Sequence, residues 1–381
     1  MKKQLLFKSL IFISIAFLLL IVGSCKKNNP VTPAPGPVQT TPATPVSLGL
    51  YEIDSSVYKD FFIPVPTIGN VTIDDYLIFD TGSGGLVLDA QGILPASMIT
   101  STGFNFPGDS VVVNGITITT QTSTITYGDD CSTANDTVYG NLAYANVTVG
   151  DQNGNLTIKR LPFFLYYKAT TGTGSVYPAH EFDIFGVNEE YDFTFSNNVN
   201  VTSPFSYFNP GTGLTRGFKS APLGPPYIYD SNAGANYAPG VITVGLTSSD
   251  VSSSSGFVTT QLKYYTGYGY PPIIPATISY NNNKTFAANI LFDSGTTGYS
   301  YVEDPTTTDT ARTTLAQNSQ LSVATTSGFN YSYTVTASDN QTYIENPTTS
   351  CSTVSIISDE YFLNNEYMLN YVTHSLGLKN N

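Results

Sequence analysis

The sequence predicts a mainly β protein with two lobes. Segments in which Val, Ile and Thr alternate with other residues flank Asn-Gly turns, a pattern typical of β-hairpins. The 27 tyrosines and 22 phenylalanines suit the pleated surface of a sheet. From about Leu48 the chain is longer than one hydrophobic core supports, since cores stop growing near roughly 250 to 300 residues. A nine-residue pattern also occurs twice, which indicates a duplicated lobe.

The beginning of the chain is typical of an export signal. Two lysines precede an apolar stretch from Leu10 to Val22, and small residues lead to Cys25. This stretch is shorter than the roughly 20 residues that cross a bilayer, so we expect a cleaved leader over residues 1–24 rather than a transmembrane helix. The small residues before Cys25 resemble a bacterial lipoprotein cleavage site, which implies a lipidated cysteine at the mature amino terminus. We therefore expect an exported protein of the bacterial cell envelope, held at the outer membrane or cell surface by its lipid anchor only.

The composition of the rest of the chain indicates a proline-rich tether followed by two lobes. Residues 25–47 are rich in proline and cannot bury a core, so we expect an extended tether. We expect an N-terminal lobe over residues 48–247 and a C-terminal lobe over residues 248–381, each with one copy of the repeated pattern.

Charge and metal-ligand spacing narrow the range of partners. The formal net charge of −13 argues against nucleic acid and anionic lipid surfaces, because both attract basic patches. The chain has two histidines, His180 and His374, and no clustered cysteines, so the usual ligand spacing of a zinc site is missing. We expect no metal, no cofactor and a monomeric protein.

Hairpin patterns give the clearest local predictions. Ser110 to Tyr127 alternates around Asn114-Gly115, and Val147 to Ile158 repeats the alternation around Asn153-Gly154. We expect helix only over Thr310 to Gln317 and within the last thirty residues.

The repeated pattern joins an apolar strand to an aspartate in a tight turn. Residues 77–85 read Leu-Ile-Phe-Asp-Thr-Gly-Ser-Gly-Gly, and residues 290–298 read Ile-Leu-Phe-Asp-Ser-Gly-Thr-Thr-Gly. In each copy a hydroxyl three residues after the aspartate can hold the carboxylate. A single Asp-Thr-Gly is more often an ordinary β-turn, but one copy in each expected lobe favours a shared site.

These paired loops resemble those of the pepsin-like aspartic proteases, whose two homologous lobes each supply a D-[TS]-G-[ST] loop to a shared cleft. Agreement extends from Leu50 to Leu378 and is weak between Val199 and Tyr237. Four further segments are similar to parts of that family. Residues 125–129 resemble the flap hairpin, and residues 140–150 resemble the strand that returns from it. Residues 182–186 resemble the strand beside the first aspartate, and residues 356–378 resemble the C-terminal segment. The resemblance implies pseudo-twofold β-barrel lobes with the active-site cleft between them.

The resemblance also implies the chemistry. Asp80 and Asp293 would be the catalytic pair, since two adjoining carboxylates that share one proton can act as base toward water and as acid toward the carbonyl oxygen. By the same resemblance, the other residues of the two loops would support the aspartates. Ser83 and Thr296 would bind the outer carboxylate oxygens, the Gly82 and Gly295 amides would support the aspartates, and Thr81 and Ser294 would interlock the loops.

The flap resembles the family less closely. Tyr127 matches the tyrosine that closes over substrate, Gly128 follows it, and Asp129 matches an acidic position of members that accept a basic side chain near the cut. The chain contains no Trp, and Val87 stands where the family has the Trp that bonds the flap tyrosine. In the second lobe Ser358 stands where the family has glycine.

Two cysteines remain after lipidation of Cys25. Cys131 falls near the flap tip by motif and Cys351 along the opposite wall of the cleft. A bond between them would close a loop of 351 − 131 = 220 residues and stabilise the fold by about 5 kcal/mol in the chain-entropy model. It could gate the cleft by redox state, or it could be an ordinary structural disulfide, or both thiols could be unpaired.

The sequence therefore favours an aspartic endopeptidase that acts on peptide or protein substrates. The main alternative is a non-catalytic envelope lipoprotein that binds peptide or glycan in the same cleft. A pure binding protein has no need for two buried carboxylates that share a proton. A serine hydrolase is disfavoured because the chain has no G-x-S-x-G elbow, and an adhesive β-module would show repeated sandwich units instead.

Overall fold

Two large β-sheets contain most strands of the described residues, which are 44–54, 59–128, 134–151, 154–223, 237–281, 284–337 and 339–381 of a computed structural model. The mainly β fold class is thus confirmed. Among these residues no helix has the length and apolar character to cross a membrane. The predicted leader and tether, with Cys25, lie outside the described residues except for the end of the tether.

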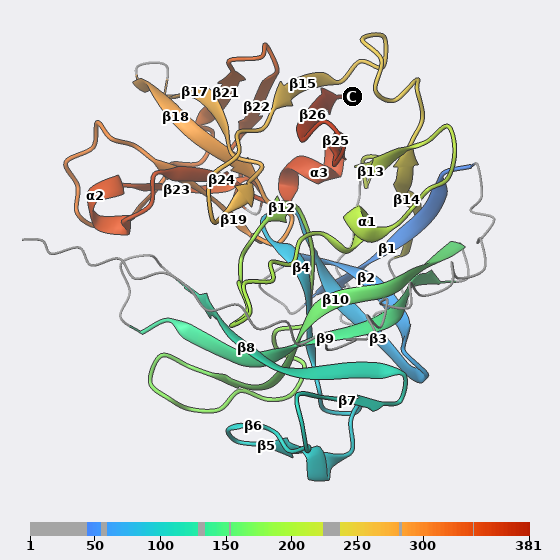
Figure 1. The fold of residues 1–381 in the computed structure, drawn as a ribbon. Coiled ribbons are helices and arrows are strands. Elements are labelled where there is room, and N and C mark those ends of the chain that lie inside the picture. The colour runs from blue at the N-terminus through green and yellow to red at the C-terminus, as the bar shows by residue number, and fades with distance from the viewer. Residues whose placement is uncertain are drawn as a thin grey trace, which may run out of the picture. The chain divides into compact units, whose positions relative to one another are not determined.

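The first sheet has the strand order β15-β26-β25-β13-β14-β1-β2-β3-β11-β4-β10-β9-β8-β7 (Figure 1). Its strands are β1 (Val46–Asp54), β2 (Lys59–Ile68), β3 (Val71–Asp80), β4 (Gly84–Asp89), β7 (Ser110–Val113), β8 (Ile116–Tyr127), β9 (Asp136–Asp151), β10 (Gly154–Thr170), β11 (Ile184–Val187), β13 (Thr215–Ser220), β14 (Tyr237–Leu246), β15 (Val258–Gln261), β25 (Asn365–Asn370) and β26 (Ser375–Asn380).

The second sheet has the order β20-β23-β19-β24-β18-β17-β21-β22. Its strands are β17 (Ile274–Tyr280), β18 (Lys284–Phe292), β19 (Tyr299–Glu303), β20 (Thr313–Thr314), β21 (Gln320–Thr325), β22 (Asn330–Thr334), β23 (Gln341–Glu345) and β24 (Val354–Ile357). After β24 the chain returns to the first sheet through β25 and β26. The division into lobes at residues 247 and 248 stays a prediction.

The remaining elements are short. Two small strand pairs join β5 (Ile99–Thr100) to β6 (Gly103–Phe104) and β12 (Glu189–Glu190) to β16 (Gly269–Tyr270). The helices are a 3-10 turn over Ala96–Met98, α1 (Pro204–Tyr207), α2 (Pro347–Ser350) and α3 (Glu360–Asn364).

Both predicted hairpins form. Strands β7 and β8 pair Val113 with Ile116, and both turn residues have positive φ, 53° at Asn114 and 77° at Gly115, as a two-residue hairpin turn requires. Strands β9 and β10 pair Val147 with Ile158, while Asn153 lies outside the described residues.

The predicted helix over Thr310 to Gln317 is wrong. Thr313 and Thr314 instead form β20 and pair with Ile344 and Tyr343 of β23. β-branched threonine favours a strand, and pairing with a neighbouring strand outweighs a weak local helix pattern. In the last thirty residues the helix is limited to Glu360–Asn364, and β25 and β26 follow it.

The topology explains how each aspartate is presented. Strand β3 ends at Asp80, and the parallel strand β11 lies beside it with Gly186 opposite Asp80. In the second sheet β18 ends one residue before Asp293, and the parallel strand β24 pairs Ile357 with Phe292. Leu77 and Phe79 in β3, and Ile290 and Phe292 in β18, are all buried. Each apolar strand thus anchors its loop in the core and leaves the aspartate at its end.

Candidate active site

The two aspartate loops hold their carboxylates in the same way. The Gly82 N–H donates to Asp80 Oδ1 at 2.7 Å, and the Ser83 hydroxyl donates to Asp80 Oδ2. The Gly295 N–H donates to Asp293 Oδ1 at 2.8 Å. The Thr296 hydroxyl completes the second copy by donating to Asp293 Oδ2 at 2.6 Å. The repeated sequence pattern therefore corresponds to a repeated hydrogen-bond pattern.

The loops approach each other so closely that each glycine faces the opposite carboxylate. A Cβ built on Gly82 would lie 2.5 Å from the carboxyl of Asp293, and one on Gly295 would lie 2.7 Å from the carboxyl of Asp80. Real side chains do not approach to such distances, so both positions require glycine. The reciprocal contact brings Asp80 and Asp293 opposite one another.

Beneath the carboxylates, Thr81 and Ser294 join the loops. The Thr81 N–H donates to Ser294 Oγ at 3.0 Å, and the Ser294 N–H donates to Thr81 Oγ1 at 2.9 Å. Each hydroxyl then donates across to the other strand, from Thr81 to the Phe292 carbonyl at 2.8 Å and from Ser294 to the Phe79 carbonyl at 2.6 Å. Both side chains are fully buried, so this network fixes the separation of the two aspartates.

The pair is electrostatically strained in its ionised form. Burial raises the pKa of Asp80 well above its usual value, and the charge of Asp293 and a hydrogen bond with it raise the pKa further. Hydrogen bonds from Ser83 and Gly82 act in the opposite direction. Two adjacent carboxylates in such a site retain one proton between them.

Tyr127, at the end of β8, faces this site. Burial raises the pKa of its hydroxyl, and the charges of Asp192 and Asp80, both within electrostatic range, raise the pKa further. Gly128 follows with φ of 135°, a value that favours glycine. Asp129 and Cys131 lie outside the described residues, so their predicted roles stay predictions.

No family model and no curated protein match this sequence. Among solved structures, the aspartic proteinase from Irpex lacteus superposes with a TM-score of 0.55 at 16% sequence identity, over 87% of this chain and 96% of that chain. The chain has a pepsin-like fold. At this level of identity the likeness shows the fold alone, and the fold class predicted from the paired loops is confirmed.

Two departures from the pepsin-like pattern have local compensation. The ring of Tyr127 stacks on Phe182 with centroids 5.2 Å apart, while Val87 is buried in the neighbouring apolar cluster. An aromatic residue from another segment thus packs against Tyr127 in a chain that lacks Trp. Next to the second sheet the Ser358 hydroxyl accepts a hydrogen bond from the Ser300 hydroxyl at 3.3 Å, so the added side chain is accommodated by a polar contact.

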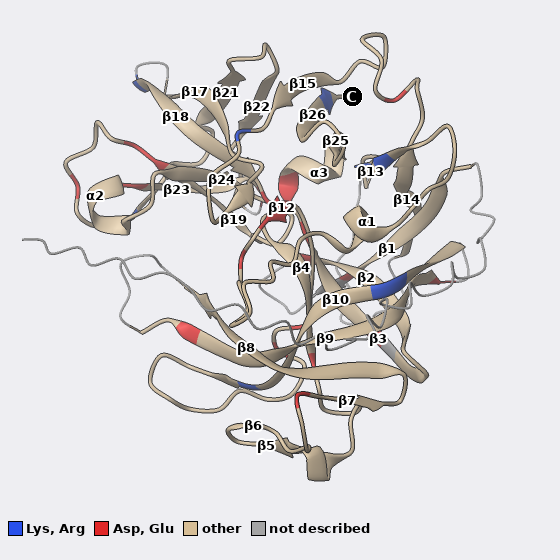
Figure 2. Ribbon diagram, in the orientation of Figure 1, with Lys and Arg blue, Asp and Glu red and all other residues tan. Residues whose placement is uncertain are grey.

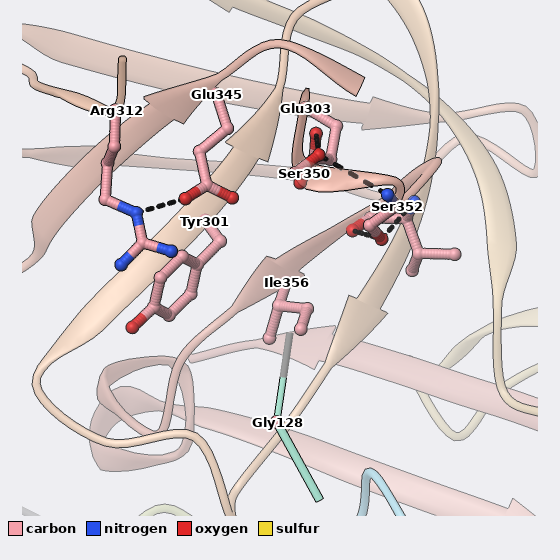
Figure 3. A pocket seen from close by; sticks show the side chains of 9 residues that line it. Gly128, Tyr301, Glu303, Arg312, Glu345, Ser350, Ser352 and Ile356 are labelled. Carbon is pink, nitrogen blue, oxygen red and sulfur yellow. Dashed lines mark hydrogen bonds and ion pairs between the residues drawn. The ribbon is translucent and has the colours of Figure 1, made fainter. Parts of the chain in front are cut away.

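A pocket of about 370 Å³ begins at Gly128 and extends along the second sheet. Figure 3 shows its lining of Tyr301, Glu303, Arg312, Glu345, Ser350, Ser352, Val354 and Ile356. Arg312 pairs with Glu345, and the Ser350 hydroxyl donates to Glu303 at 2.5 Å. The pocket therefore adjoins the residue that follows Tyr127, and much of its lining is charged or polar. Cys351 lies between two lining serines, and its predicted pairing with Cys131 stays a prediction.

Sequence reasoning missed two residues that contact the first aspartate loop. Asn188 is fully buried, and its N–H donates to the Ser83 carbonyl at 3.0 Å. Asp192 accepts a hydrogen bond from the Gly84 N–H. Both follow Gly186 within a few residues, but nothing in the run Asn-Glu-Glu-Tyr-Asp indicates which of its side chains turns toward the dyad.

A second acidic group lies toward the other end of β3. His180 Nδ1 is 2.6 Å from Asp183 Oδ2 and 3.7 Å from Asp75 Oδ2, a donor set that could in principle hold a metal ion. The hydrogen bond with Asp183 raises the pKa of His180 to about 9, with further charge contributions from both aspartates against the opposing effect of burial. The imidazolium thus supplies the positive charge for this cluster, and a metal ion bound there would have to displace its proton.

Proposed function

We propose that the protein is an aspartic endopeptidase in which Asp80 and Asp293 activate water. The main support is the reciprocal arrangement of the two loops, in which each carboxylate is held by its own glycine amide and hydroxyl and faces the glycine of the other loop. The pepsin-like fold supports the same class of reaction. Function still depends on the site and not on the fold, so the dyad is the feature to test.

The dyad geometry supports a direct mechanism. The ionised carboxylate accepts a proton from water as the water oxygen attacks the peptide carbonyl carbon, and the protonated carboxyl gives its proton to the carbonyl oxygen. This forms a neutral tetrahedral diol. The carboxylate that received the proton then donates it to the peptide nitrogen, the C–N bond breaks, and the other carboxylate recovers a proton from the diol. The products are a carboxylic acid and an amine, and the dyad again holds one proton.

Tyr127 and the pocket beyond Gly128 support a peptide as substrate. Tyr127 lies within electrostatic range of Asp80, so an extended chain held between them would be shielded from water over the scissile bond. The pocket of about 370 Å³ would hold a side chain further along the peptide. We propose in addition that the protein acts in the cell envelope from a lipid anchor on Cys25.

The test of this function is digestion of a peptide library by wild-type protein and by the Asp80→Asn and Asp293→Asn variants. Each substitution is expected to lower hydrolysis by at least roughly a hundredfold while leaving the fold intact. A transition-state mimic with a tetrahedral hydroxyl should block the wild type, and a metal chelator should leave it active. Undiminished hydrolysis by either variant contradicts the proposal, and tight binding of peptides without any cleavage would favour the binding protein instead.

A further inference from the structure

An acidic segment follows β11 and lies against the first aspartate loop. Asn188 anchors the start of this segment to Ser83, and Asp192 accepts the Gly84 N–H at its end. The approach is close between these points, since a Cβ on Gly84 would lie 2.3 Å from the Glu190 carbonyl oxygen. Figure 2 shows the acidic residues of β12 in this region. The backbone contacts fix Asp192 next to the loop that holds Asp80.

The Asp192 side chain is accessible to solvent, but nearby protein atoms partly desolvate its carboxyl. The residue is exposed and Glu190 is half-buried. Even so, desolvation raises the pKa of the Asp192 carboxyl to about 8, with further contributions from the charges of Glu190 and Asp293 and an opposing one from the Gly84 hydrogen bond. Asp192 is thus a solvent-accessible carboxylate beside the loop that holds Asp80 and within electrostatic range of Asp293.

The electrostatic influence of Asp192 on Tyr127 indicates where the Asp192 carboxylate lies. The charge of Asp192 contributes more to the raised pKa of the Tyr127 hydroxyl than the charge of Asp80 does. Asp192 therefore lies within electrostatic range of Tyr127 and is hydrogen-bonded to the loop that holds Asp80. A peptide held between Tyr127 and the dyad would present to Asp192 a side chain that flanks the scissile bond.

Neither carboxylate has a cationic partner in the described part of the chain. Asp192 forms no ion pair with any described residue, and the same holds for Glu190. Two like charges on desolvated carboxyls are unfavourable until a cation neutralises them. An ammonium or guanidinium group of a ligand would supply that charge and form charge-assisted hydrogen bonds.

We propose that Asp192, with Glu190 beside it, selects substrates with lysine or arginine next to the scissile bond. This inference rests on the proposed peptidase function and names its substrate class. A purely structural role for Asp192 predicts a different behaviour, because an asparagine at this position keeps an oxygen that accepts the Gly84 N–H and loses only the charge.

The experiment uses pairs of quenched peptides that differ only in lysine or norleucine, a side chain of similar length without charge, at each position flanking the cut. The readout is the ratio of kcat/KM for lysine over norleucine. Wild type should favour lysine by roughly tenfold or more at one position, as expected for a hydrogen bond to a charged group. Asp192→Asn should reduce this ratio to about one, and Glu190→Gln should reduce it less. Asp109→Asn is the matched control, since Asp109 is exposed and the substitution changes the net charge equally.

A peptide-binding measurement tests the acidic subsite independently of the proposed peptidase activity. The same peptides are titrated by fluorescence anisotropy against Asp80→Asn protein, with and without Asp192→Asn. A lysine preference that disappears with Asp192→Asn supports the acidic subsite even if wild type cleaves nothing, in which case only the peptidase proposal fails. Equal binding and cleavage of the lysine and norleucine peptides overturns the subsite. A preference that survives Asp192→Asn, or that Asp109→Asn removes equally, also overturns it.

Discussion

Thr81 and Ser294 each donate a backbone N–H to the hydroxyl oxygen of the other, at 3.0 and 2.9 Å. The two residues are 213 positions apart in sequence and fully buried. The relationship makes the separation of the two aspartate loops depend on side chains that lie beneath the carboxylates.

Removing one hydroxyl of this network should destabilise the fold. Thr81→Val keeps the shape but leaves the Ser294 N–H and the Phe292 carbonyl without their partner. Each buried polar group left unsatisfied costs about 1–3 kcal/mol, so the free energy of unfolding should fall by about 2–6 kcal/mol in a denaturant titration. Thr120→Val, at an exposed position, should change it by less than about 0.5 kcal/mol. Equal effects of the two substitutions would show that the network adds no stability.

The dyad should cost stability in the wild type. Because burial and the charge of Asp293 raise the pKa of Asp80, ionisation of both carboxylates opposes folding at neutral pH. Asp80→Asn removes one of the two ionisable carboxyls and keeps a group of the same shape, so its melting temperature at pH 7.5 should equal or exceed that of the wild type, although the proposed activity should be lost. A clearly lower melting temperature would mean that the Asp80 carboxylate stabilises the fold.

Stability should fall as pH rises from about 5 to 8. Burial raises the pKa of several carboxyls above that of unfolded chains, to about 6 for Asp60, about 7 for Asp75 and Glu190, and about 8 for Asp192. The folded state then binds more protons than the unfolded state in this window, and the free energy of unfolding decreases with pH. At the acid end Asp250, whose pKa Lys219 and Thr247 lower, loses its stabilising effect once it is protonated.

Thermal melts at pH 4.5, 6 and 7.5 in buffers of equal ionic strength measure this dependence. The highest melting temperature should occur at the lowest of these three values. A melting temperature that rises steadily toward pH 7.5 would contradict the assignment of raised pKa values to the folded state.

The lipid anchor is tested at Cys25. If this cysteine is acylated after export, the wild-type protein should fractionate with membranes and incorporate a labelled fatty acid, whereas Cys25→Ala should do neither. Labelling that persists in the variant would assign the anchor to another residue. Soluble wild-type protein without label would exclude the anchor altogether.

The sequence predicted the features that depend on local pattern and on repetition. Alternating residues around Asn114-Gly115 specify a hairpin because few residues tolerate two successive positive φ values, and the two aspartate loops identify each other by being duplicated. The site contacts of Asn188 and Asp192 could not be predicted, since they depend on how the segment after Gly186 passes behind the Ser83 loop. The strand at Thr313 was missed for a related reason, because its partner Ile344 is distant in sequence.

The return of the chain to its first sheet has a consequence for biosynthesis. Strand β13 pairs with β14 on one side and with β25 on the other, and β26 continues the sheet beyond β25. A chain that is synthesised from its amino terminus therefore keeps the β13 edge unpaired until residues 365–380 have been made. Unpaired strand edges recruit other strands, so a chaperone present during synthesis would protect this protein more than one whose sheets close in sequence order.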